Sequence, residues 1–193
     1  MRQLFILGTI ALLGACSKPV ETPAVPTAGT STAGVQAGAQ APATAAPAPS
    51  APGLLSASGV GAVRFGMSLA QAEQATGAQA VLPAPFDPAC SMVRFPALPG
   101  LRFMVEQGIV TRADAEPGTG NVMGIAIGDP LDGIRASYPE GVLTPHKYDA
   151  NGHYLAFPSA GGRGALILEA TGGKVTKVRA GLQPAVAYVE TCG

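Results

Sequence analysis

The densest group of side chains able to do chemistry lies in residues 145–154, which read Pro-His-Lys-Tyr-Asp-Ala-Asn-Gly-His-Tyr and hold both histidines of the chain. His146, Asp149 and His153 offer nitrogen and oxygen atoms that zinc binds, and a catalytic zinc site uses three protein ligands and leaves one position open. The histidine spacing does not match a helical His-x-x-x-His pair, however, and residues 149–152 have the composition of a hairpin turn. The sequence therefore favours a strand, a turn and a strand with outward polar side chains over a metal site.

The same stretch also has the composition of a small-ligand site. Tyr148 and Tyr154 offer flat apolar ring faces, and ligand pockets commonly combine an apolar lining with a few directed polar groups. The candidate ligand-binding residues are His146, Tyr148, Asp149, Asn151, His153 and Tyr154. This mixture of aromatic rings and hydrogen-bonding groups suggests a sugar as the ligand. Glycan binding is therefore an alternative function.

Motifs of common enzymes are absent from the sequence. It has no Gly-x-Ser-x-Gly, no His-Glu-x-x-His and no phosphate-binding loop that ends in Lys-Ser or Lys-Thr. Glu106 and Glu169, each just before a predicted hairpin, are candidates for the carboxylate pair of a glycoside hydrolase, but an internal repeat explains them as well. We predict that the chain is not an enzyme and takes no metal or cofactor.

The amino-terminal residues 1–15 have the parts of an export signal. Arg2 supplies positive charge, a mostly apolar run covers residues 4–13, and small residues follow. The run is too short for a transmembrane helix, which needs about 20 apolar residues. The ending Leu-Gly-Ala-Cys at residues 13–16 resembles the lipobox of bacterial lipoproteins, which implies that Cys16 carries lipid and begins the mature chain. The alternative is an ordinary cleaved signal followed by a chance cysteine.

Residues 16–52 read as a tether. They are rich in Ala, Pro, Thr and Gly, show no apolar period, and carry charge only at Lys18 and Glu21. Such a segment cannot bury enough apolar surface to offset the entropy lost on ordering. We predict a disordered tether that holds a domain at the bacterial cell envelope, with the lipid in the outer membrane and the domain facing the periplasm.

Charge and cysteine content restrict the partners and the redox setting. The chain has 12 Lys plus Arg and 12 Asp plus Glu, so it lacks the excess positive charge that neutralises phosphates, and nucleic acid is excluded as a partner. With Cys16 lipidated, Cys90 and Cys192 remain as one pair in an exported chain, where disulfides persist. A disulfide between them is favoured over a reactive thiol, because neither has a His or Lys beside it.

The globular part, residues 53–193, contains two segments that echo each other. Residues 62–72 and 124–134 align Gly66 with Gly128, and each reads as a short strand, a glycine turn and a helix. The first helix has a capping box of Ser68 and Gln71 and ends at Gly77. In the second, Asp129 is the expected cap and Pro130 the first helical residue.

Strand patterns follow each helix. Residues 101–106 and 109–113 flank a glycine turn, as do residues 164–169 and 174–178, and further strands are expected at residues 91–95 and 153–157. The sequence thus predicts two tandem strand–helix–three-strand repeats, over residues 59–117 and 122–193. The predicted fold class is α+β, with helices packed on an antiparallel sheet.

The helix start at Gly66-Met67-Ser68, with Ala72 behind it and a strand meander that ends in a glycine hairpin, resembles small outer-membrane lipoprotein domains of the SmpA/OmlA type. The tandem arrangement is similar to the β-lactamase-inhibitor-protein fold. The chain has no tryptophan, although such domains often have one in their strands. The resemblance implies a noncatalytic role in protein binding or envelope assembly, with a lectin-like glycan- or peptidoglycan-binding lipoprotein as the alternative.

Overall fold

The structure, a computed structural model, describes residues 53–192 of the 193-residue chain. The export signal, the lipidation site Cys16 and the tether predicted for residues 1–52 lie outside this part. Within the described part, no helix is both long and apolar enough to cross a membrane.

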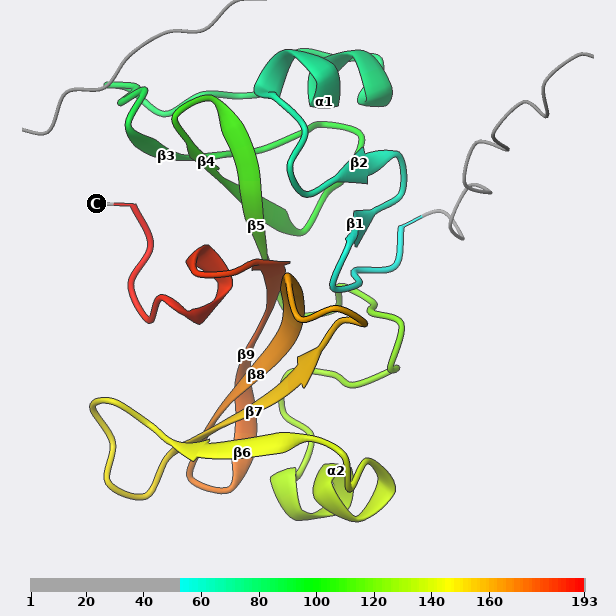
Figure 1. The fold of residues 1–193 in the computed structure, drawn as a ribbon, viewed down its shortest axis with the longest axis vertical. Coiled ribbons are helices and arrows are strands. Elements are labelled where there is room, and N and C mark those ends of the chain that lie inside the picture. Colours follow the sequence, from blue (N-terminus) through cyan, green and yellow to red (C-terminus); the bar gives the residue numbers. More distant parts are fainter. Residues whose placement is uncertain (1–52, 193) are drawn as a thin grey trace, which may run out of the picture. The chain divides into compact units, whose positions relative to one another are not determined.

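Two helices and two antiparallel sheets make up the domain (Figure 1). The elements in chain order are β1 (Gly59–Val60), β2 (Val63–Arg64), α1 (Leu69–Thr76), β3 (Cys90–Val93), β4 (Leu101–Glu106), β5 (Ile109–Ala115), α2 (Leu131–Ser137), β6 (Val142–Pro145), β7 (His153–Pro158), β8 (Gly164–Thr171), β9 (Lys174–Leu182) and the 3₁₀ turn η1 (Ala185–Ala187). β1 and β2 form the small sheet, and the other seven strands form the large one. The predicted α+β class is confirmed.

The large sheet consists of two meanders joined at one seam. Its strand order is β3-β4-β5-β9-β8-β7-β6, so every neighbouring pair except β5 and β9 is also consecutive in the chain. β5 and β9 pair antiparallel, with Arg112 opposite Gly181 and Asp114 opposite Arg179. The seam therefore brings charged residues from the two halves of the chain onto one face of the sheet, near its middle.

The two helix starts are fixed differently. At α1, the predicted capping box forms: Ser68 Oγ accepts from Gln71 N, Gln71 Oε1 accepts from Ser68 N, and Gly77 ends the helix in a left-handed conformation. At α2 the predicted cap is wrong by one residue, because Pro130 occupies the cap position and the helix begins at Leu131. The Asp129 carboxylate instead accepts from Ala126 N at 2.8 Å, closing the turn before the helix.

The strand predicted at residues 124–127 does not form. The buried side chain of Asn121 holds this segment as a loop: its Oδ1 accepts from Met123 N and Ile125 N, and its Nδ2 donates to Ile125 O at 2.6 Å. With its backbone groups satisfied by one side chain, the segment needs no neighbouring strand. The sequence suggested a strand here because residues 124–134 echo residues 62–72, but the buried Ile125 is a loop residue.

The two faces of the large sheet have different chemistry. The main core collects buried apolar side chains from both helices, from the small sheet and from one face of the large sheet, including Val60, Val63, Ala72, Leu131, Ile134, Leu166 and Leu168. Ala165 and Ile167 alternate with these along β8 and pack with Val186 on the opposite face. Residues 183–192, here called the C-terminal strap, cover part of that opposite face, which we call the strap face.

Candidate functional site

Two buried arginines hold the C-terminal strap on the sheet. Arg112 of β5 and Arg179 of β9 are each only 2% exposed. Arg112 NH1 donates to the carbonyl of Tyr188 at 2.7 Å, and Arg179 Nε donates to the carbonyl of Val186 at 2.8 Å. A buried guanidinium without acceptors is costly, so these carbonyls stabilise the arginines while the arginines fix the path of the strap.

A disulfide fastens the far end of the strap. Cys192 is bonded to Cys90 at the start of the edge strand β3, with a Cα–Cα distance of 5.4 Å. The disulfide predicted from the cysteine count is confirmed. The strap is therefore held at the middle of the sheet by hydrogen bonds and at its edge by a covalent bond.

Glu169 of β8 is the charge centre of the strap face. This carboxylate is 4% exposed and receives Lys177 Nζ on Oε1 at 2.8 Å and Arg179 NH1 on Oε2 at 2.9 Å. Burial raises the pKa of Glu169, but the hydrogen bonds from Lys177 and Arg179, together with the nearby His146 ring, outweigh burial, and the pKa lies below its ordinary value. Glu169 is therefore held ionised, which suits an anchor for cations rather than a general acid.

The predicted ligand loop between β6 and β7 is tied into this centre through His146. Its Nδ1 accepts from the backbone N–H groups of Tyr148 and Asp149 at 3.1 and 3.0 Å, so any proton on the neutral ring is on Nε2. Nε2 lies 3.2 Å from Glu169 Oε1 but is not aligned for a hydrogen bond. Nδ1 of the imidazole thus fixes the shape of the loop, and Nε2 places the ring against Glu169.

The other predicted loop residues divide between the loop and the strands. Asp149 Oδ1 accepts from Asn151 N at 2.9 Å, which closes the turn. His153 and Tyr154 lie at the start of β7, and the Tyr154 ring stacks on His146 at 4.7 Å with Arg179 also against the ring at 5.4 Å. Across residues 53–192, no group of three or more His, Cys, Asp or Glu side chains is arranged to hold a metal ion.

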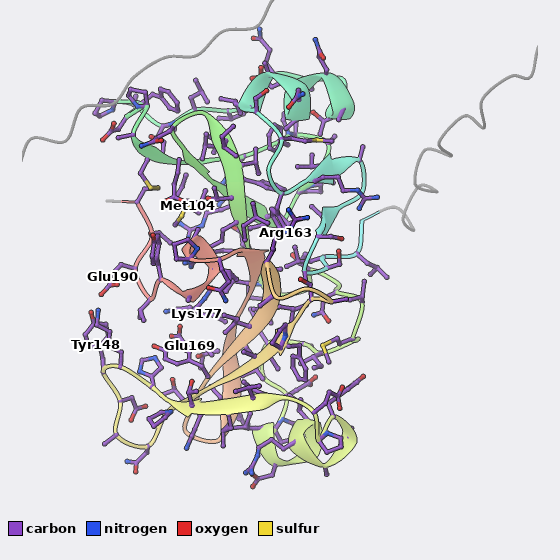
Figure 2. All side chains as sticks on the ribbon, in the orientation of Figure 1. Met104, Tyr148, Arg163, Glu169, Lys177 and Glu190 are labelled. Carbon is purple, nitrogen blue, oxygen red and sulfur yellow. A yellow bond between two sulfur atoms is a disulfide. The ribbon has the colours of Figure 1, made fainter. Side chains whose placement is uncertain are left out.

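The tip of the loop reaches the strap at Glu190. Tyr148 OH donates to the Glu190 carboxylate, which also receives Lys147 Nζ at 3.0 Å. These two hydrogen bonds lower the pKa of Glu190 to about 2. Figure 2 places Tyr148 and Glu190 on the same side of the sheet as Glu169 and Lys177. The loop, the strap and the sheet therefore meet in one continuous polar surface.

A cavity of about 610 Å³ opens between the strap and the sheet. Its lining comes from β4, β5, β9, the strap and the residues that directly follow β3 and β5, and it includes four cationic side chains, Arg94, Arg102, Arg112 and Lys177. These four residues and Arg179 were not predicted from the sequence as site residues. One signal was present: Arg112-x-Asp114 and Lys177-x-Arg179 place like-facing charges two residues apart on otherwise apolar strands.

The paired-carboxylate hypothesis loses its basis in the strand register. In the β4–β5 hairpin Glu106 lies opposite Ile109, beside the turn, whereas Glu169 lies opposite Lys177, two residues farther from its own turn. Counted from the turns, Thr171 matches Glu106, and Met104 matches Glu169. The equivalence drawn from sequence between Glu106 and Glu169 was wrong, because it aligned the glutamates rather than the turns.

Comparisons with protein-family models, with curated proteins and with solved structures find no match to this chain.

Proposed function

We propose that this protein is an envelope-anchored lipoprotein whose domain is a noncatalytic protein-binding or envelope-assembly module. On this proposal Cys16 carries the lipid, residues 16–52 form the tether, and the domain faces the periplasm from the outer membrane. The observation that carries the binding role is the strap face: its reactive side chains are engaged in fixing the loop and the strap, which creates a rigid, charged surface with a cavity. The disulfide is in keeping with an exported chain.

We also propose that the two halves are copies of one unit. Equivalent hydrogen bonds tie each helix start to its hairpin: Gly66 N to Val110 O, and Gly128 N to Val175 O, both at 2.8 Å. Each hairpin also has a register shift at the same distance from its turn. Two independent segments have no physical reason to repeat both features, so duplication of one unit is the simpler origin.

Crosslinking in intact cells tests the binding role. A photoreactive amino acid replaces Tyr188, which is 42% exposed on the strap; the control replaces Gln74, an exposed residue of α1. The proposal expects a discrete protein adduct from position 188 and none from position 74. Equal adducts from both positions, or none from either at matched expression, would contradict a partner site on the strap face.

Metabolic labelling tests the anchor. Incorporation of labelled palmitate is expected in the wild-type chain and not in Cys16→Ser, and mass spectrometry of the mature amino terminus is expected to begin at Cys16. A mature chain that begins elsewhere, or that carries no acyl group, would remove the lipoprotein part of the proposal.

The glycan alternative depends on Tyr148, which is 65% exposed. Tyr154 is less suited to a sugar, because the His146 ring already stacks on it. A glycan array and a peptidoglycan pull-down decide between the functions: specific sugar binding that disappears in Tyr148→Ala would favour the lectin-like function over the protein-binding one.

A further inference from the structure

We propose that the cavity between the strap and the sheet binds a carboxylate group of an acidic peptide segment, with Arg102 and the free terminal nitrogen of Arg112 as its main ligands. This inference rests on the proposed protein-binding function and names the surface and the chemistry through which it acts.

Arg112 offers one nitrogen that the fold does not use. Its Nε donates to Asp114 at 2.7 Å, and its NH1 is taken by backbone carbonyls of the strap. NH2 makes no hydrogen bond, yet the one sealed side-chain nitrogen or oxygen without a hydrogen bond in the described region is His146 Nε2. Arg112 NH2 is therefore not completely sealed, although the residue is only 2% exposed, and because Arg112 lines the cavity, NH2 is the nitrogen left to meet an incoming oxygen there.

Arg102 is the cation of the cavity that has no carboxylate partner. On the same face, Arg94 pairs with Glu116 at 2.5 Å, Arg112 pairs with Asp114, and Lys177 pairs with Glu169 at 2.8 Å. For Arg102, no hydrogen bond or ion pair is found within residues 53–192. The hydrogen bond from Arg94 is the main cause that lowers the pKa of Glu116, and the charge of Arg102 adds to that shift. Its guanidinium is exposed at β4 and lies opposite Asp114 in the sheet register.

The charge count selects a carboxylate over a phosphate. Four cations line the cavity against three carboxylates, those of Asp114, Glu116 and Glu190, which leaves one positive charge. A carboxylate carries one negative charge and matches the planar fork of a guanidinium. A phosphate group near neutral pH carries between one and two charges, so it would meet uncompensated repulsion from the three carboxylates.

The dimensions favour a side chain that enters from a larger partner. The volume of about 610 Å³ lies in the range of small-molecule pockets, but the cavity is open to one side and its lining is more charged than that of a typical ligand pocket. An acidic side chain can insert while its own backbone remains outside. The strap is fixed at both ends and forms one wall of the cavity before any ligand arrives. Binding therefore loses little conformational entropy in the strap.

Titration of a defined peptide tests the proposal. The mature protein, purified in detergent, is titrated with fluorescein-labelled hexaglutamate at low salt, with hexaglutamine as the uncharged probe. We expect binding of hexaglutamate alone, about tenfold weaker binding in Arg102→Gln, and unchanged binding in Arg163→Gln, a matched variant of an exposed arginine outside this cavity. Affinity should fall between 50 and 500 mM NaCl, since salt screens such contacts over distances of about 10 Å and less.

Each other outcome overturns the inference. Absence of hexaglutamate binding to the wild type, or equal losses in Arg102→Gln and Arg163→Gln, would show that the cavity is not the site. Inorganic phosphate that displaces the peptide more strongly than acetate at equal concentration would replace the carboxylate by a phosphate. A partner crosslinked at position 188 whose capture is unaffected by Arg102→Gln would support the proposed function and contradict this inference. Binding of hexaglutamate at the cavity without any crosslinked partner would support the carboxylate site and contradict the proposed function.

Discussion

Arg179 NH1 lies 2.9 Å from the carboxylate of Glu169, and both side chains are almost completely buried. The same guanidinium holds the carbonyl of Val186 through its Nε. Through these two contacts one residue of β9 connects β8 with the C-terminal strap. Because the pair is out of water, removing one partner leaves the other as a buried unpaired charge.

Glu169→Ala is therefore expected to destabilise the domain by about 3–5 kcal/mol, the range for breaking a buried ion pair by deleting one member. Urea unfolding measures the effect. The matched control is Glu106→Ala on β4, whose carboxylate is half-buried and accepts one hydrogen bond from Thr111; its cost should be about 1 kcal/mol, that of one ordinary hydrogen bond. Equal losses in the two variants would contradict the central role of Glu169.

The stability of the domain should fall in acid. The pKa of Glu169 is lower in the folded state than its ordinary value of 4.5, so the folded carboxylate binds its proton less readily than the unfolded one. The resulting stabilisation is fully present above the unfolded pKa and is lost as the pH falls through the folded pKa.

Urea midpoints measured at pH values from 7 down to 3 check this dependence. Glu169→Gln should show a shallower decline below about pH 4.5 than the wild type, because it lacks the titrating group. A decline of equal slope in both proteins would assign the acid sensitivity to other carboxylates.

Loss of the disulfide should destabilise without changing the fold. The bridge joins residues separated by 102 positions, and a loop of that length is stabilised by about 4–5 kcal/mol on the chain-entropy model. Paired Cys90→Ser and Cys192→Ser changes should lower the free energy of unfolding by up to this amount. Circular dichroism at low temperature should still show the sheet, since the strap retains its hydrogen bonds to Arg112 and Arg179.

Two glycine substitutions should act in opposite directions. At Gly181 on the β5–β9 seam, an added Cβ would lie 2.4 Å from Thr111 O and 2.7 Å from the Arg112 Cα, so Gly181→Ala must push the strands apart. At Gly133 inside α2 the nearest atom outside the backbone of the helix is 3.7 Å away. Gly133→Ala should therefore stabilise the helix by about 0.5–1 kcal/mol. Thermal unfolding of both variants tests the contrast, and a rise in the midpoint for Gly181→Ala would refute the close approach.

Local signals in the sequence predicted much of the fold. The capping box of Ser68 and Gln71, the glycine turns and the alternating strands depend on neighbouring residues, and they were found where they were expected. The Cys90–Cys192 bridge followed from counting cysteines in an exported chain. These features need no knowledge of distant contacts.

The missed features depend on side-chain hydrogen bonds and strand register that the residue pattern does not specify. The Asn121 side chain replaced strand hydrogen bonds with its own, and the β-bulges shifted the register of both hairpins. The candidate site was only partly anticipated: His146 lies against it, with its Nε2 3.2 Å from Glu169, a contact that the sequence did not predict. Arg112 and Arg179 could not be assigned, because their acceptors are strap carbonyls, which any residue type can supply.

The β5–β9 seam also has a consequence for how the chain folds. All other strand pairs of the large sheet are consecutive and close short loops, whereas β5 and β9 must meet across residues 116–173. Closing a long loop costs more conformational entropy than closing a short one. Nonlocal strand pairs therefore form late, and they slow the folding of a chain. The three strands of the first meander lie within residues 90–115 and pair with one another without β9. The two halves are thus expected to assemble separately, and their docking is the step that determines the folding rate.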